Sequence, residues 1–379
     1  MQRPALPPPV LGPPRPRGVV RAAIVLLGAV VLLAACSSST ETQTGGGAGS
    51  GSSSTAGDGS TPASGTFPVT IDHKYGSTTI EARPTRVVTV GLTDQDAVLA
   101  LGVVPLGVAD WLKAHPSAIG PWATDAVGGG ALPEVISDAT VIDYESIAAL
   151  EPDVILGLYS GLTETEYETL NQIAPTVAQP GDVVDYGIAW QDQARTVGAV
   201  LGESAKADEL VTDVEARFAA ALEDNPDFDG AEGLVATIYD GKVSIYGPED
   251  VRGRFMAGLG FTQPPEVAEL AAGTFSADVS MERVDLVDVD VLVWIVLDVD
   301  TDKPKFDADP IYSNLAVHTG GHDVYVANGS DLGSALSFQS VLSLPFLLDE
   351  LVPQLATAQA GTGGASGTGG AAATTSTPG

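Results

Sequence analysis

Two arginines separated by one residue, Arg252 and Arg254, have the spacing that most strongly suggests a binding site. A guanidinium group donates two parallel hydrogen bonds to anionic or carbonyl oxygens, so the pair predicts a site for an oxygen-rich ligand. Both lie at the start of a predicted helix that ends at Leu259, where the helix dipole does not favour positive charge. This placement favours ligand binding over the alternative, two surface arginines at a helix start.

Aromatic and small polar side chains follow the ends of several predicted strands. Ligands of open parallel sheets bind beyond the carboxyl ends of the strands, and Tyr and Trp offer an apolar face with a polar tip. The candidate ligand contacts chosen in this way are Thr93, Gln95, Trp111, Tyr159, Tyr239 and Tyr246, with Asp94, Ser160 and Ser337 as weaker candidates. Packing is the alternative role of each aromatic residue, and Trp294, inside a strongly apolar strand, is expected to be core.

Glu145 and Glu282 occupy corresponding places in two segments that align without a gap. Each stands eight residues before an aspartate, Asp153 or Asp290, that opens an apolar strand. Each is expected in the first turn of a short helix, where the dipole favours a carboxylate. Ordinary helix starts ahead of buried strands are the alternative, but the repetition favours two similar lobes.

The four histidines of the chain do not favour a metal centre. His318 and His322 have a spacing that can share a metal on a helix, but the Thr-Gly-Gly between them indicates a turn. His73 and His115 are interpreted as solitary surface or packing side chains. We therefore expect neither a metal site nor a cofactor.

The sequence carries no pattern that favours an enzyme. It has no Gly-x-Ser-x-Gly elbow and no phosphate-binding loop, and its single cysteine, Cys36, precedes the predicted folded region. We expect a protein that is not an enzyme. A secreted hydrolase and an adhesive lipoprotein are kept as alternatives of other classes.

The first 35 residues have the order of a secretory signal, with four arginines, no acidic residue, and then an apolar run over 22–35. The run is shorter than the roughly 20 residues that span a bilayer as a helix. Its Leu-Ala-Ala-Cys36 ending resembles the lipobox of bacterial lipoproteins, in which the cysteine receives a lipid. We expect a lipid-anchored protein on the outer face of the membrane; an ordinary signal or a short anchor is the alternative.

The chain is strongly acidic, with a formal net charge of −32. Removal of the first 35 residues leaves 13 basic and 49 acidic residues, which is a net charge of −36. Such a charge repels nucleic acid, so we expect no nucleic-acid partner. Any anionic ligand must meet one of very few basic residues.

The middle of the chain alternates predicted strands and helices, which indicates mainly parallel sheets covered by helices. The expected strands are 86–90, 103–108, 153–158, 234–239, 243–246, 291–296 and 324–327, and the expected helices are 94–101, 143–150, 163–173, 252–259 and 344–355. The predicted organisation is a signal peptide (1–35), a flexible Ser/Gly-rich tether (36–66), an N-terminal α/β lobe (67–195), a long connecting helix (196–225), a C-terminal α/β lobe (226–356) and a low-complexity tail (357–379).

Four motifs stand in order between Phe67 and Leu355: Ile80-Glu-Ala-Arg-Pro-Thr-Arg-Val-Val, Leu99-Ala-Leu-Gly-Val-Val-Pro-Leu-Gly, Glu145-Ser-Ile-Ala-Ala-Leu-Glu-Pro-Asp-Val-Ile and Ile173-Ala-Pro-Thr-Val. Together they resemble motifs of the substrate-binding lipoproteins of ABC importers for ferric siderophores, haem and cobalamin. The ending from Ser337 to Pro353 fits the iron-siderophore branch.

This resemblance implies a rigid fold of two similar α/β lobes joined by one long helix, with the ligand in the cleft between them. It implies a ferric siderophore as ligand, with haem or cobalamin as alternatives, and delivery to an ABC permease in the same membrane. The family docks a glutamate of each lobe onto the permease, and Glu145 and Glu282 match those positions. We expect the protein to be a monomer.

Overall fold

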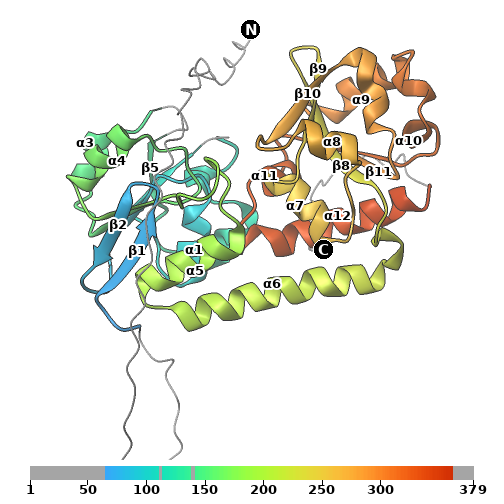
Figure 1. The fold of residues 1–379 in the computed structure, drawn as a ribbon. Helices are drawn as coiled ribbons and strands as arrows, with labels where there is room; N and C mark the ends of the chain where they lie inside the picture. Colours follow the sequence, from blue (N-terminus) through green and yellow to red (C-terminus); the bar gives the residue numbers. More distant parts are fainter. Residues whose placement is uncertain (1–64, 111–112, 138–140, 362–379) are drawn as a thin grey trace, which may run out of the picture. The chain divides into compact units, whose positions relative to one another are not determined.

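The computed structural model describes residues 65–110, 113–137 and 141–361, which fold as two α/β lobes (Figure 1). The N-terminal lobe begins with an antiparallel hairpin and continues into a five-stranded parallel sheet of order β5-β4-β3-β6-β7. Its strands are β1 (Val69–His73), β2 (Gly76–Ile80), β3 (Val87–Thr89), β4 (Gly107–Ala109), β5 (Glu134–Ser137), β6 (Val154–Gly157) and β7 (Thr176–Ala178). Every residue of the central strands β3 and β6 is buried, as expected for a parallel sheet covered on both faces.

The helices of this lobe are α1 (Asp94–Ala100), η1 (Pro116–Ala118), η2 (Pro121–Ala123), α2 (Thr124–Val127), α3 (Tyr144–Ala149), α4 (Glu164–Asn171) and α5 (Trp190–Leu201). Two of them, α3 and α4, begin at residues whose side chains cap them. Asp143 accepts a hydrogen bond from the Ser146 amide, and Thr163 forms a capping box with Glu166.

The sheet of the C-terminal lobe has the order β10-β9-β8-β11-β12, which parallels that of the first sheet strand for strand. Its strands are β8 (Gly233–Tyr239), β9 (Lys242–Tyr246), β10 (Ser276–Ser280), β11 (Val291–Val296) and β12 (Asp323–Ala327). Only β9 is reversed, because β8 and β9 form the hairpin predicted at Asp240-Gly241. Both turn residues have positive φ, 48° and 72°, as a tight hairpin turn requires.

Short helices cover this second sheet, and one long helix closes the lobe. They are η3 (Pro226–Phe228), α7 (Val251–Gly258), α8 (Pro265–Leu270), η4 (Met281–Val287), α9 (Val299–Ala308), η5 (Tyr312–Asn314), α10 (Ala316–Thr319), α11 (Asp331–Ser337) and α12 (Ser343–Gln359).

The helix α6 (Ser204–Asp224) joins the two lobes, and its 21 residues span about 30 Å. The predicted start of this helix at residue 196 is wrong, because residues 196–201 belong to α5. Gly202 ends α5 in the left-handed conformation, with φ of 69°, which glycine adopts without steric strain. The two helices then pack against each other.

The C-terminal helix α12 also differs from the prediction, because it continues past residue 356 to Gln359 and so enters the expected low-complexity tail. It packs along α6 (Figure 1). The ring of Phe346 on α12 lies 5.6 Å from the ring of Trp122 in η2 of the other lobe. The lobes are therefore held together by packing as well as by the connecting helix.

The two repeated segments occupy equivalent places in the two sheets. Asp153, just before β6, accepts hydrogen bonds from the amides of Thr85 (2.8 Å) and Arg86 (2.9 Å), which precede β3. Asp290, just before β11, accepts one from the amide of Glu232 (2.9 Å), which precedes β8. Each aspartate thus fixes the start of the neighbouring strand, which gives this part of the repeat a structural role.

Cys36 and the predicted signal and tether to residue 64 lie outside the described residues. Among the residues described, no helix is both long and apolar enough to cross a membrane. The strand expected over 103–108 is confirmed only from Gly107, since residues 103–106 form a loop.

Candidate functional site

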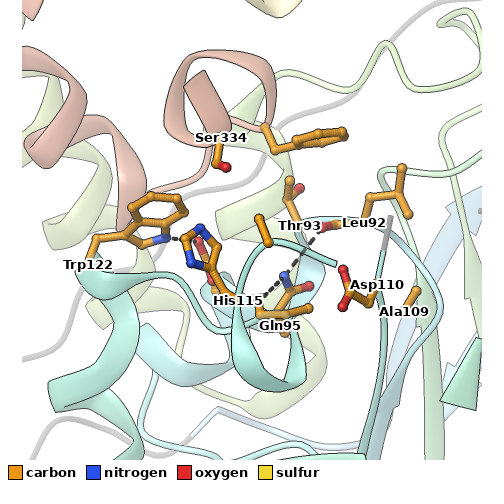
Figure 2. A pocket seen from close by; sticks show the side chains of 12 residues that line it. Leu92, Thr93, Gln95, Ala109, Asp110, His115, Trp122 and Ser334 are labelled. Carbon is orange, nitrogen blue, oxygen red and sulfur yellow. Dashed lines mark hydrogen bonds between the residues drawn. The ribbon is translucent and has the colours of Figure 1, made fainter. Parts of the chain in front are cut away.

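A cavity of about 50 Å³ lies between the two lobes (Figure 2). Its floor is formed by segments that follow the carboxyl ends of β3 and β4, and its other wall by α11 and the residue after it. The described residues that line it are Leu92, Thr93, Gln95, Asp96, Ala109, Asp110, Ala114, His115, Ala118, Trp122, Ser334 and Phe338. The position matches the ligand site expected for open parallel sheets.

The turn from β3 into α1 is fixed by Asp94, whose side chain is fully buried. Its carboxylate accepts hydrogen bonds from the amides of Leu158 (2.7 Å) and Tyr159 (3.0 Å), at the end of β6. Gln193 on α5 donates to Asp94 (2.7 Å) and to the Thr93 hydroxyl (2.8 Å). Burial raises the pKa of Asp94. This network holds the first turn of α1 at the cavity.

Gln95 is the predicted contact with the clearest unmet hydrogen-bonding capacity. Its side-chain nitrogen donates to the carbonyls of Leu92 and Ala118, both at 3.3 Å (Figure 2). These two bonds fix the orientation of the amide, and its oxygen Oε1 is buried without a hydrogen-bond partner. A buried acceptor in this state costs about 1–3 kcal/mol, so the site favours a ligand or water that donates to it.

His115 packs against Trp122, which is one of the two roles expected for it, and it also lines the cavity. Its Nδ1 lies 3.8 Å from the carboxylate of Asp331 at the start of α11, and its ring meets the Trp122 ring edge-on at 5.7 Å. Its Nε2 is buried without a partner, as is the hydroxyl of Ser334 on α11. Three unpaired polar atoms, from Gln95, His115 and Ser334, therefore lie on one cavity.

Asp96 connects the cavity to the contact between lobes. Its Oδ2 accepts hydrogen bonds from Trp122 Nε1 (2.8 Å) and from the hydroxyl of Ser340 in the other lobe (2.6 Å). The side chain is buried, and burial raises the pKa of Asp96 to about 6. Sequence reasoning missed Asp96 because it stands within a helix and its partner is 244 residues away.

Arg252 and Arg254 lie in the first turns of α7, as predicted, but both are engaged. Arg252 donates to both oxygens of Asp250 (2.7 Å each), and its guanidinium lies 3.6 Å from the centre of the Tyr246 ring. Arg254 donates to the Gly187 carbonyl of the other lobe (2.9 Å). The two arginines thus belong to a second polar cluster at the interface of the lobes, and neither lines the described cavity.

The remaining aromatic residues considered as ligand contacts lie in different parts of the structure. Tyr159 is buried against Tyr186, with ring centres 5.7 Å apart, and burial raises its pKa. Tyr239 lies at the end of β8 with half of its surface exposed and does not line the cavity. Trp294 is core, and its indole donates to the Tyr312 hydroxyl (2.8 Å). Trp111 lies outside the described residues.

The two weaker serine candidates are both buried. Ser160 donates to the Gly157 carbonyl (2.6 Å), which gives it a structural partner. The Ser337 hydroxyl has no partner, but Ser337 does not line the described cavity.

Glu145 and Glu282 are exposed in the first turns of α3 and η4, where they were expected. The helix α3 follows β5, and η4 follows β10, and these two strands have the same place at the edge of their sheets. Both strands run parallel to the central strand of their sheet, so both glutamates lie on the carboxyl side of a sheet. Their role in docking stays a prediction.

The His-x-x-x-His pair has two separate sets of partners. His318 Nδ1 lies 2.7 Å from the buried carboxylate of Asp323, and His322 Nδ1 donates to the Ala358 carbonyl (2.7 Å). Among the residues that the structure describes, no group of three or more His, Cys, Asp or Glu side chains is arranged to hold a metal ion.

Comparison with known proteins gives consistent matches. A family model described as periplasmic binding protein matches residues 87–321. A probable siderophore-binding lipoprotein of Bacillus subtilis (strain 168) is 28% identical over 314 residues, covering 79% of this chain and 88% of the relative.

Two solved structures are similar to most of the described region. The crystal structure of a periplasmic solute binding protein from Mycobacterium smegmatis has 35% identity and a TM-score of 0.68, covering 77% of this chain and 99% of that one. The iron-uptake substrate-binding protein of Streptococcus pneumoniae, solved in complex with ferrichrome, has 25% identity, the same TM-score of 0.68 and the same coverage of 77% and 99%.

Proposed function

We propose that this chain, which belongs to the periplasmic binding protein family, captures a ferric siderophore between its lobes and delivers it to the permease of an ABC importer. The observation that carries the proposal is the cavity between the lobes, where Gln95, His115 and Ser334 each present a buried polar atom without a partner. A chelate rich in amide and oxygen groups supplies the missing hydrogen bonds. The names of the relatives support iron chelates as the ligand class.

The cavity must enlarge to admit such a ligand. Its volume of about 50 Å³ is well below the roughly 300–1,000 Å³ of small-molecule sites. The wall contains a strained segment, because Lys113, Ser117 and Ala118 have φ of 52°, 54° and 54°, a region that costs non-glycine residues about 1–3 kcal/mol each. Relaxation of this segment offsets part of the cost of opening the cavity.

Delivery is assigned to Glu145 and Glu282. Each is exposed after the equivalent edge strand of its lobe, on the carboxyl side of the sheet. The cavity also lies at the carboxyl ends of strands, so the docking surface and the ligand site share one side of each sheet. This arrangement supports delivery of the ligand from the side of the molecule that carries both glutamates.

The remaining parts of the proposal concern the anchor and the chemistry. Cys36 carries a lipid that tethers the protein to the outer face of the membrane, and the naming of a relative as a lipoprotein supports this. The protein acts as a monomer, requires no cofactor and performs no reaction on its ligand, which leaves with its iron. Haem and cobalamin are the alternative ligands.

Tryptophan fluorescence of the purified mature chain tests ligand capture, because Trp122 lines the cavity. We expect saturable quenching by a ferric siderophore and no response to haem or cobalamin. Replacement Gln95→Leu should weaken the affinity at least about tenfold, since it removes the unpaired acceptor. The matched control is Gln172→Leu, at the exposed end of α4. A protein that responds to none of these ligands contradicts the proposal.

Charge reversal tests the docking step separately. The double variant Glu145→Lys/Glu282→Lys should abolish uptake of labelled chelate by cells while the affinity of the purified protein stays unchanged. A control with the same change of charge is Glu209→Lys/Asp213→Lys, on the exposed face of α6. Loss of affinity in the first variant, or loss of uptake in the control, would show that the assignment of docking is wrong.

A further inference from the structure

We infer that the cavity selects ferric chelates that are electrically neutral or cationic, such as the tris-hydroxamates, over the anionic catecholate and citrate chelates. This inference rests on the proposed function and names the ligand class of the same site. It follows from the charges that line the cavity and from the partners that its nearest arginines already have.

The lining of the cavity carries two aspartates, and its one imidazole, that of His115, lies 3.8 Å from the carboxylate of Asp331. Asp96 and Asp110 both line it, and no lysine or arginine does so among the described residues. The neighbouring positions outside the described ranges, 111–112, are Trp and Leu in the sequence. An anionic chelate in the cavity therefore meets like charges at short range, where the low dielectric strengthens the repulsion.

Within the described ranges, the hydrogen-bond donors to the two carboxylates of the cavity are neutral groups, which do not cancel the negative charge. Asp96 accepts from the Trp122 indole and the Ser340 hydroxyl, which are both neutral. Asp110 accepts a hydrogen bond from the backbone amide of Lys113 (2.8 Å), a neutral donor. The mature chain adds a net charge of −36, which further opposes the approach of anions.

The arginines at the interface of the lobes do not offset the negative charge of the cavity lining. Arg252 is held by both oxygens of Asp250, and the side chains of this pair are 16% and 4% exposed. A trianionic chelate that recruited Arg252 would leave the Asp250 carboxylate buried without its partner, which is strongly unfavourable. Arg254 already donates to the carbonyl of Gly187.

The unpaired polar atoms favour the same class of ligand. Gln95 is 5% exposed, and both of its amide hydrogens are used, so its buried oxygen can only accept. It requires a donor such as the amide N–H or ammonium group of a hydroxamate siderophore. Deprotonated citrate around iron offers carboxylate oxygens instead. These oxygens are acceptors too, so they cannot donate a hydrogen bond to the Gln95 oxygen and repel it.

Isothermal titration calorimetry of the mature chain at about 150 mM salt, where long-range steering is screened, tests the inference. The ligands are ferrichrome (neutral), ferrioxamine B (cationic), ferric enterobactin and ferric dicitrate (both anionic). We expect Kd for the better of the first two to be at least roughly 100-fold below that of either anionic chelate, as two like-charge contacts would give. An anionic chelate that binds as tightly overturns the inference and leaves the proposed function intact. A chain that binds none of the four overturns both.

The variant Asp110→Asn tests the charge argument directly, because the asparagine oxygen can still accept from the Lys113 amide. We expect ferrioxamine B to bind on the order of fivefold more weakly and ferric enterobactin more tightly, with ferrichrome nearly unchanged. The control Asp213→Asn removes the same charge from the exposed face of α6. Equal changes for all chelates, or equal effects of the control, would contradict a role for the cavity charge.

Discussion

At the scale of single residues, Asp96 takes part in both the cavity wall and the contact between lobes. It is a buried carboxyl with two neutral hydrogen-bond donors, and its pKa of about 6 lies well above its usual value of 3.8. The native state therefore binds this proton more tightly than the unfolded chain. Between about pH 4 and 6 the contribution of Asp96 to the free energy of unfolding must fall as the pH rises.

The first prediction concerns this pH dependence. The lost contribution corresponds to about 3 kcal/mol, since one pKa unit equals about 1.4 kcal/mol. Asp96→Asn stays neutral at every pH. From pH 4 to pH 7, the fall in its free energy of unfolding should therefore be about 3 kcal/mol smaller than the fall for the wild type. Urea unfolding at the two pH values measures the difference, with Asp213→Asn as control. Parallel behaviour of Asp96→Asn and the wild type would show that Asp96 does not titrate in this range.

The second prediction concerns the ion pair of Arg252 with Asp250. Arg252→Met should lower the free energy of unfolding by about 3 kcal/mol, because Asp250 is 3% exposed and would keep an unpaired buried charge. The double variant Asp250→Asn/Arg252→Met should recover at least half of this loss. Denaturant unfolding of the single and double variants provides the measurement, and additive losses would argue against the pair.

Sequence reasoning found only part of the site at this scale. Thr93 and Gln95 were identified because they follow a recognisable strand, and the strand ends locate the cavity. His115 offered the same signal, since it follows the second strand, but its solitary position made packing the simpler interpretation. Ser334 gave no signal, because its place on the cavity depends on how the second lobe meets the first.

At the scale of elements, the break between α5 and α6 is the clearest departure from the predicted helix. The helical pattern of apolar residues continues through this region, so periodicity alone favours one helix. The break depends on Gly202, and a Cβ added there would lie 2.9 Å from the ring of Phe67. Packing of the N-terminal segment against the glycine was not visible in the spacing of the residues.

The third prediction concerns the role of Gly202 in this break. Gly202→Ala should lower the free energy of unfolding by about 2 kcal/mol or more, since it adds a clash with Phe67 to the strain of a left-handed residue. Gly230→Ala is the matched control, because Gly230 has φ of 82° but open space around a new Cβ. It should cost only about 1 kcal/mol. Thermal unfolding of both variants measures the two losses of stability. Equal losses for Gly202→Ala and Gly230→Ala would exclude the contact with Phe67 as a cause.

At the scale of the whole molecule, several contacts between described residues join the lobes in addition to α6. They include the bond from Ser340 to Asp96, the bond from Arg254 to the Gly187 carbonyl and the ring contact of Phe346 with Trp122. The sequence predicted two lobes and one long helix correctly, since the α/β rhythm repeats on both sides of the helix. It contained no local pattern for contacts between residues so far apart.

The fourth prediction follows from these contacts. The two lobes should unfold in a single transition, so circular dichroism and tryptophan fluorescence should give coincident urea curves. Phe346→Ala should lower the free energy of unfolding by about 2–4 kcal/mol and can separate the curves, because it removes part of the packing between lobes. Two separate transitions in the wild-type protein would contradict this coupling.

The contact of the last helix with the first lobe also determines when the binding site comes into existence. The bond between Asp96 and Ser340 spans 244 residues, and the cavity wall contributed by α11 comes late in the chain. Contacts of this sequence separation form slowly, because a long stretch of chain must be ordered first. Because the chain is synthesised from its N-terminus, the cavity lacks its second wall until nearly the whole chain has been made. Only the finished chain therefore presents the cavity with both of its walls.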